Sequence, residues 1–92
     1  MEADLDREFE IAAETIKNNA DALGKLKDEQ KLAIYANFKQ GTEGDNTTKR
    51  PGMMDFKGKA KWDAWTKIAG TSKEDAKKAY VALAKEHLPD KF

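Results

Sequence analysis

The sequence predicts an all-α fold of four helices. Apolar residues recur at three- and four-residue steps along four segments, as they do on the buried face of an amphipathic helix. No segment alternates β-branched with polar residues as a strand would, and valine occurs once. A chain of 92 residues is long enough for one core, so we expect residues 1–92 to form a single domain.

The first two helices are predicted from apolar spacing and from the residues that interrupt it. Asn18-Asn19 and Gly24 end the first helix and open a loop. Asp28 is the expected N-cap of the second helix, and Gly41 and Gly44 end it. The apolar positions are Leu5, Phe9, Ala12, Ala13 and Ile16 in the first helix and Leu32, Tyr35, Ala36 and Phe38 in the second.

A long loop is expected before the third helix. Residues 41–55 contain glycine, aspartate, asparagine, three threonines and proline, all of which favour turns. Loops of this length inside a small helical domain are often functional. We expect Arg50 and Asp55, near its end, to fix its shape rather than to contact a ligand.

The third and fourth helices complete the fold. The third starts near Phe56, and Gly70 stops it. Ser72 is the expected N-cap of the fourth, with Asp75 where a capping box places an acid, and Pro89 ends it. The apolar positions are Ala60, Trp62, Trp65 and Ile68 in the third helix and Ala76, Ala79, Tyr80, Leu83 and Leu88 in the fourth.

Composition excludes several classes of function. Cysteine is absent and there is one histidine, so a disulfide, a thiolate metal site or a zinc cage is not expected. The net charge is zero, which disfavours a general nucleic-acid-binding protein. The N-terminus lacks the pattern of a secretory signal, and no apolar run approaches the ~18 residues of a membrane span. We therefore expect a cytoplasmic protein.

Charge is unevenly distributed along the chain. Residues 1–30 carry nine acids and four bases, whereas residues 31–61 carry seven bases and three acids. In the third helix, the four-residue spacing places Lys57, Lys61 and Trp65 on one face, with Trp62 beside Lys61. A cationic edge next to an aromatic face suits a ligand that has one anionic end and one apolar end.

The second helix carries a matching group of side chains. Tyr35, Phe38 and Lys39 are spaced i, i+3 and i+4, so one face presents a hydroxyl, a flat ring and a cation. A phosphate is bound by such point charges and directional donors. Taken singly, most of these residues have ordinary structural explanations. Trp65 is expected to be core, and the remaining lysines, Lys59, Lys73, Lys77, Lys78 and Lys85, are expected to face solvent.

Several long segments of the sequence are distinctive: YANFKQ at 35–40, GDN at 44–46, RPGMMDFKGKAKWDAW at 50–65, GTSKEDA at 70–76, and Ala79-Tyr80. In this order they resemble the acyl-CoA-binding protein family, also called diazepam-binding inhibitor. The resemblance runs from about Phe9 to Leu88. Two features depart from the family pattern: Phe38 replaces a usual tyrosine, and the first loop, from Asn18 to Lys27, is a few residues longer than in common vertebrate members.

The resemblance implies an up-down-down-up four-helix bundle that binds medium- to long-chain fatty acyl-CoA without reacting with it and without a cofactor. It also implies a role for each of ten residues. The 3′-phosphate would contact Tyr35, Lys39 and Lys61, and the adenine would contact Phe38 and Tyr80. Lys17 and Lys57 would lie at the rim, and Leu32, Met53 and Trp62 would line the acyl path.

Two other classes of function are alternatives. One is a protein- or membrane-interaction module that uses the lysine-rich faces. A carrier could use the same faces for transient contact with membranes or with acyl-CoA-using enzymes. The other is a small acyl-transfer or hydrolytic enzyme, which needs a nucleophile and a base. The chain has one serine, expected to be a helix cap, and His87 near its end, so we expect no enzyme activity. We expect a monomer.

Overall fold

The structure is all-helical, as the sequence predicts. It is a computed structural model that describes the backbone of residues 2–92 and the side chains of residues 4–92. Within this range no strand occurs, and no helix is long and apolar enough to cross a membrane. The helices are α1 (Glu2–Asn18), α2 (Ala20–Leu23), α3 (Asp28–Glu43), α4 (Phe56–Lys67), α5 (Lys73–His87) and the short 3-10 helix η1 (Pro89–Lys91).

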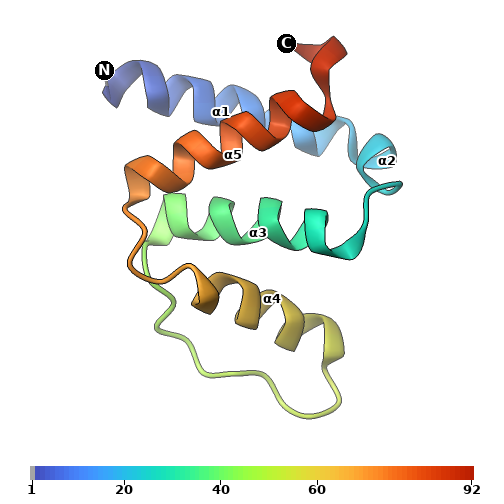
Figure 1. Cartoon of the computed structure of the whole chain (residues 1–92), viewed down its shortest axis with the longest axis vertical. Helices are drawn as coiled ribbons and strands as arrows, with labels where there is room; N and C mark the ends of the chain where they lie inside the picture. The colour runs from blue at the N-terminus through green and yellow to red at the C-terminus, as the bar shows by residue number, and fades with distance from the viewer. Residues whose placement is uncertain (1) are drawn as a thin grey trace.

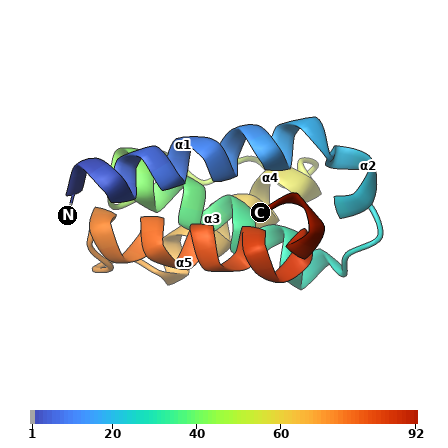
Figure 2. The ribbon, with the colours of Figure 1, turned by 90° about the horizontal axis from the view of Figure 1, so that it is seen from above.

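The four long helices run up, down, down and up. Helices α1 and α5 point the same way, and α3 and α4 point the opposite way (Figure 1). Helix α5 packs on both α1 and α3, whereas α4 packs on α3 (Figures 1 and 2). Helices α1 and α4 therefore lie on opposite sides of a flat molecule that measures 39 × 30 × 15 Å.

Small residues and one aromatic cluster form the core. Ala12, Ala76 and Ala84 are fully buried, which lets the helix backbones approach one another. Phe9, Phe38 and Tyr80, from α1, α3 and α5, have ring centroids 5.0–5.6 Å apart. Such aromatic pairs add about 0.5–1.5 kcal/mol each beyond the area that they bury. This aromatic cluster joins the three helices that surround the cavity described below.

Gly41 lies inside α3 rather than at its end, contrary to the prediction. A Cβ atom at this position would be 3.1 Å from Cγ of Lys77 on α5 and 3.5 Å from Cε1 of Phe9. Glycine is needed here for close helix packing, not to terminate the helix. Helix α3 continues to Glu43 and ends at Gly44, whose φ of 80° is the left-handed conformation that favours glycine.

Other boundaries differ from the prediction by one residue. Lys27, not Asp28, is the N-cap of α3, and its backbone N–H donates to the Gln30 side chain. Asp28 is already helical, where its charge still favours the helix N-terminus. Ile68 and Leu88 lie one residue past α4 and α5 as their C-caps. The predicted first loop contains the four-residue helix α2.

The predicted cap of α5 and the predicted shaping of the long loop are confirmed. The Ser72 side chain accepts a hydrogen bond from the Asp75 backbone N–H, and Asp55 caps α4 by accepting from Gly58 N–H. Arg50 makes two hydrogen bonds to Asp63 of α4, at 3.0 and 2.9 Å. This ion pair raises the pKa of Arg50 and lowers that of Asp63.

A buried amide connects α3, α4 and both adjoining loops. Gln40 is completely buried; its amide nitrogen donates to Asp45 and to the Thr71 carbonyl, and its oxygen accepts from the Trp65 indole. Asp45 also accepts from the Gly70 N–H, and this bond, with that from Gln40, lowers the pKa of the carboxyl. Buried polar groups must be paired in this way, because each unpaired group costs free energy.

We expect Gln40→Ala to lower the free energy of unfolding by about 2–4 kcal/mol, because it leaves a cavity and removes partners from Thr71 and Asp45. Urea denaturation followed by circular dichroism measures the change. Gln30→Ala is the matched control, since that side chain only caps the exposed start of α3 and should cost about 1 kcal/mol or less. Equal losses in the two variants would contradict the role assigned to Gln40.

Candidate functional site

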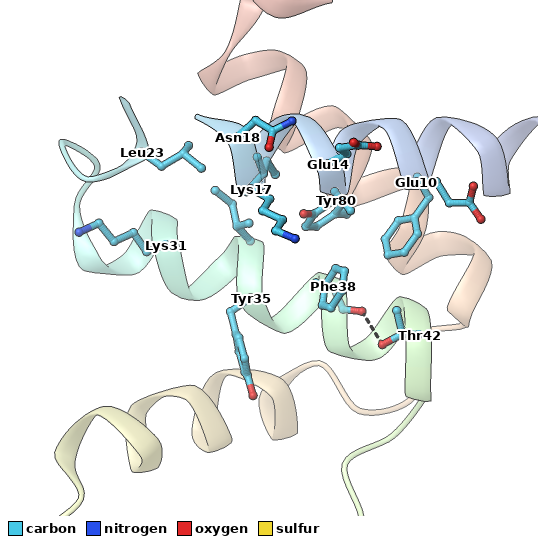
Figure 3. A pocket seen from close by; sticks show the side chains of 14 residues that line it. Glu10, Glu14, Lys17, Asn18, Leu23, Lys31, Tyr35, Phe38, Thr42 and Tyr80 are labelled. Carbon is cyan, nitrogen blue, oxygen red and sulfur yellow. Dashed lines mark hydrogen bonds between the residues drawn. The ribbon is translucent and has the colours of Figure 1, made fainter. Parts of the chain in front are cut away.

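A groove of about 800 Å³ opens between α1 and α3, with α2 at one end and α5 beneath (Figure 3). Its volume lies in the range of sites that bind small molecules and cofactors. The apolar lining comes from Phe9, Ala13, Ile16, Leu23, Ile34, Phe38 and Tyr80, and the polar lining from Glu10, Glu14, Lys17, Asn18, Lys31, Tyr35 and Thr42. The groove therefore combines an apolar floor with a charged margin.

Two members of the aromatic cluster, Phe38 and Tyr80, which are the predicted adenine contacts, form part of the groove. Tyr80 is only 3% exposed, so its ring belongs to the core, while its side chain still faces the groove (Figure 3). Desolvation by burial raises the pKa of its phenol to about 12. The same rings therefore stabilise the fold and offer a flat apolar surface to a ligand.

Lys17 lies at the groove, at the position predicted for the rim. Its side chain extends from α1 toward Phe38 and Tyr80, whereas Lys31 on α3, which also lines the groove, directs its ammonium outward (Figure 3). Lys17 therefore places a cation beside the aromatic surface. Glu10 and Glu14 on the same helix give the margin both signs of charge.

Tyr35 connects the groove to α4. It lines the groove, and its phenol extends toward α4 (Figure 3). The Lys61 ammonium lies 5.4 Å from the centroid of the Tyr35 ring, within the range of a cation–π interaction. The structure thus brings these two predicted phosphate ligands together from different helices, although Lys61 itself is not part of the groove wall.

Lys39, the third predicted phosphate ligand, is one turn beyond Tyr35 on α3. Its ammonium lies 5.0 Å from the centroid of the Trp65 ring and is paired with the carboxylate of Glu43. Lys39 does not line the groove. A ligand phosphate at this ammonium would have to share it with Glu43 or displace that carboxylate.

The remaining predicted site residues lie outside the groove. Lys57 is exposed at the start of α4, Leu32 is half-buried, and Met53 is 83% exposed. Trp62 donates its indole N–H to the Thr48 carbonyl and so attaches the long loop to α4. Trp65 is buried, as predicted for a core residue.

Part of the groove and the surroundings of two lysines are not evident from the sequence. Periodicity predicted that Phe9 and Ala13 face inward, but it could not show that the α1–α3 gap stays open there. Lys77, expected in solvent, pairs with Asp6 at 2.6 Å and lies over Phe9. Lys59, also expected in solvent, donates to the Met53 carbonyl. The spacing of each lysine along its helix is typical of a solvent-exposed face.

The model of the family described as acyl CoA binding protein matches residues 6–84 of this chain. The chain belongs to this family. The resemblance seen in the sequence is thereby confirmed.

Relatives and solved structures of the family agree over most of the chain. Acyl-CoA-binding protein homolog 1 of Caenorhabditis elegans is 53% identical over 78 residues, which cover 85% of this chain and 87% of that protein. The homolog of Manduca sexta is 50% identical over 80 residues, 85% of this chain and 84% of that one. The crystal structure of acyl-CoA-binding protein 2 of Oryza sativa has a TM-score of 0.84 and 41% identity, covering 94% of this chain and 92% of that one.

The raised pKa of Tyr80 predicts a loss of stability in base. Below pH 10 the phenol is neutral in both the folded and the unfolded state, so its ionisation does not affect the free energy of unfolding. Between pH 10 and about 12 the unfolded chain releases the phenol proton first, and the free energy of unfolding falls as pH rises. Urea unfolding at pH 9 and pH 11 should show a smaller decrease in the free energy of unfolding for Tyr80→Phe than for the wild type. Tyr35→Phe is the control. If it reduces this decrease as much as Tyr80→Phe does, the role assigned to Tyr80 is contradicted.

Proposed function

We propose that this protein is a carrier of medium- to long-chain fatty acyl-CoA. It binds the ester as a single-domain monomer in the cytoplasm, without a cofactor, and releases it unchanged. Membership of the acyl-CoA-binding protein family supports this proposal, together with a groove that has an apolar floor and Lys17 and Lys31 among its polar lining. The ligand has an anionic nucleotide at one end and a hydrocarbon chain at the other, so it requires both kinds of surface.

The position of Tyr35 is the single observation that supports the proposal best. Tyr35 is among the residues that line the groove, and its ring extends from α3 to α4, where the Lys61 ammonium lies 5.4 Å from the ring centroid (Figure 3). One residue therefore joins the aromatic surface of the groove to the cations of the neighbouring helix. A nucleotide whose base lies in the groove would direct its phosphates to this junction.

We assign the nucleotide end to this junction. Tyr35, Lys39 and Lys61 would hold the 3′-phosphate, while Phe38 and Tyr80 would contact the adenine. Each charge-assisted hydrogen bond adds about 1.5–3 kcal/mol, and stacking of a base on an aromatic ring adds roughly 1–3 kcal/mol. Lys17 and Lys57 would complete the rim on either side, Lys17 from α1 and Lys57 from α4.

We assign the acyl end to the region near Leu32, Met53 and Trp62. Burial of hydrocarbon contributes roughly 0.8 kcal/mol for each methylene. For a long chain this sum exceeds the contribution of any single head-group contact. Affinity should therefore rise with acyl length until the available apolar surface is covered.

The placement of the serine and the histidine supports a non-enzymatic role. Ser72 caps the start of α5 through its side chain, and His87 is the last residue of the same helix. The helix has fifteen residues, so the two side chains are separated by roughly 20 Å. Neither side chain can activate the other for attack on a thioester, which requires hydrogen-bond distance.

Calorimetric titration with palmitoyl-CoA should show tight binding, while free palmitate binds far more weakly. Lys39→Ala and Lys61→Ala should each raise Kd by about ten-fold or more, since each removes a charge-assisted hydrogen bond. Lys73→Ala is the control and should leave Kd unchanged. Equal affinity for palmitate would overturn the proposed ligand, and equal effects of all three substitutions would overturn the phosphate assignment.

Glu43→Gln should tighten binding of palmitoyl-CoA. In the free protein Glu43 pairs with Lys39, and a phosphate bound there would lie near a second negative charge. Two like charges about 5 Å apart in water repel by roughly 0.8 kcal/mol, so Kd should fall about three- to ten-fold at low salt. The gain should disappear with a ligand that lacks the 3′-phosphate. A gain that persists with that ligand would contradict the placement of Lys39.

A further inference from the structure

Three large apolar side chains protrude from the end of the long loop. Met53 is 83% exposed, Met54 86% and Phe56 71%. We call these three residues the apolar tip. Isolated exposed apolar residues are normal on a protein surface, but a contiguous group indicates an interaction site. The tip lies where the loop enters α4, at the side of the molecule far from α1 (Figure 1).

The apolar tip is held in place by hydrogen bonds rather than by burial. The Lys59 ammonium donates to the Met53 carbonyl at 2.9 Å and lies 5.0 Å from the centroid of the Phe56 ring. Between them, the Asp55 N–H donates to the Gly52 carbonyl, and the Asp55 side chain caps α4. These hydrogen bonds fix the backbone of the tip, which lowers the entropy lost when the tip binds a partner.

The charge around the tip has the opposite sign to that of the far side of the molecule. Residues 49–61 carry five bases and one acid, whereas α1 carries six acids and two bases. Because α1 and α4 lie at opposite sides of the fold, the molecule has a basic end and an acidic end (Figure 1). A negatively charged surface would attract the basic end and repel α1.

We infer that the apolar tip docks on the surface of a bilayer that contains anionic lipids. Met54 and Phe56 would enter the boundary between headgroups and acyl chains, and Lys49 and Lys59 would contact the headgroups. Apolar side chains combined with flanking cations are the two features that hold a protein at a membrane interface. This inference deepens the proposed function, because it names the lipid surface at which the carrier would exchange its ligand.

The position of the tip also suits such an exchange. Met53, assigned to the acyl path, belongs to the tip, and Lys57 and Lys61 follow it on α4. An acyl-CoA molecule in a bilayer has its chain among the lipids and its nucleotide in water. Docking of the tip would place the apolar path at the lipid boundary and the cations of α4 near the nucleotide.

Flotation of the whole protein with lipid vesicles tests the inference. The protein should float with vesicles of phosphatidylcholine and phosphatidylserine and remain unbound with pure phosphatidylcholine; added salt should release it. Met54→Ser should weaken binding about five- to ten-fold, because one apolar anchor is lost. Lys49→Gln should weaken it about five-fold and reduce its salt dependence.

Ile11→Ser provides the matched control. Ile11 is a large apolar residue, 51% exposed, on the acidic helix α1, and its substitution should leave vesicle binding unchanged. Equal losses for Ile11→Ser and Met54→Ser, or equal binding to both vesicle types, would overturn the inference. Unchanged vesicle binding by Met54→Ser would also overturn the inference. That result is expected if the basic end recognises an acidic protein instead.

Calorimetry separates this inference from the proposed function. Palmitoyl-CoA should bind Met54→Ser with the affinity of the wild type, since the docking role of Met54 is distinct from ligand binding. A wild type that floats with anionic vesicles but does not bind palmitoyl-CoA would overturn the carrier role alone. A wild type that binds palmitoyl-CoA but not vesicles would overturn the docking surface alone.

Discussion

The fold depends on the buried amide of Gln40. Its three partners, Trp65, Asp45 and Thr71, lie on α4 and on the loops at either end of it, and the Trp65 indole also donates to the Gly44 carbonyl. Helix α4 packs on α3 at the edge of the molecule, and its preceding loop has few apolar residues to bury. Polar pairing inside a low-dielectric contact therefore fixes where α4 lies, because each group would be costly to leave unpaired. The position of Lys61 over Tyr35 follows from that placement.

The aromatic cluster has two roles that constrain each other. Phe9, Phe38 and Tyr80 join three helices, and Phe38 and Tyr80 also line the groove. A ring that is fixed in the core loses little conformational freedom when a flat ligand binds against it, so the site is pre-organised. The replacement of a hydroxyl-bearing ring by Phe38 retains this packing, since the contact to Phe9 and Tyr80 uses the ring alone.

Charge acts at two distances in this protein. Near the groove, individual pairs such as Lys39 with Glu43 bring together charges from adjacent turns of one helix. Across the whole molecule, the separation of the acidic α1 from the basic α4 creates an oriented field although the net charge is zero. At ordinary salt, interactions between exposed charges are screened over roughly 10 Å. Pairing between neighbouring side chains therefore acts on the affinity for a bound ligand. The asymmetry across the molecule acts on how the protein approaches a charged surface and on its orientation there.

The sequence alone determined the all-α class, the limits of most long helices to within a residue or two, the burial of Trp65 and the cap at Ser72, because periodicity and capping are local properties. It also identified the family, because its motifs are long and specific. Only the tertiary structure decided that Gly41 serves a helix contact, that Gln40 connects α4 to the core, and that a groove opens between α1 and α3. These features depend on residues that are distant in the chain, such as Gly41 with Lys77 and Tyr35 with Lys61. Spacing along one helix shows which residues share a face, but not which other helix that face meets.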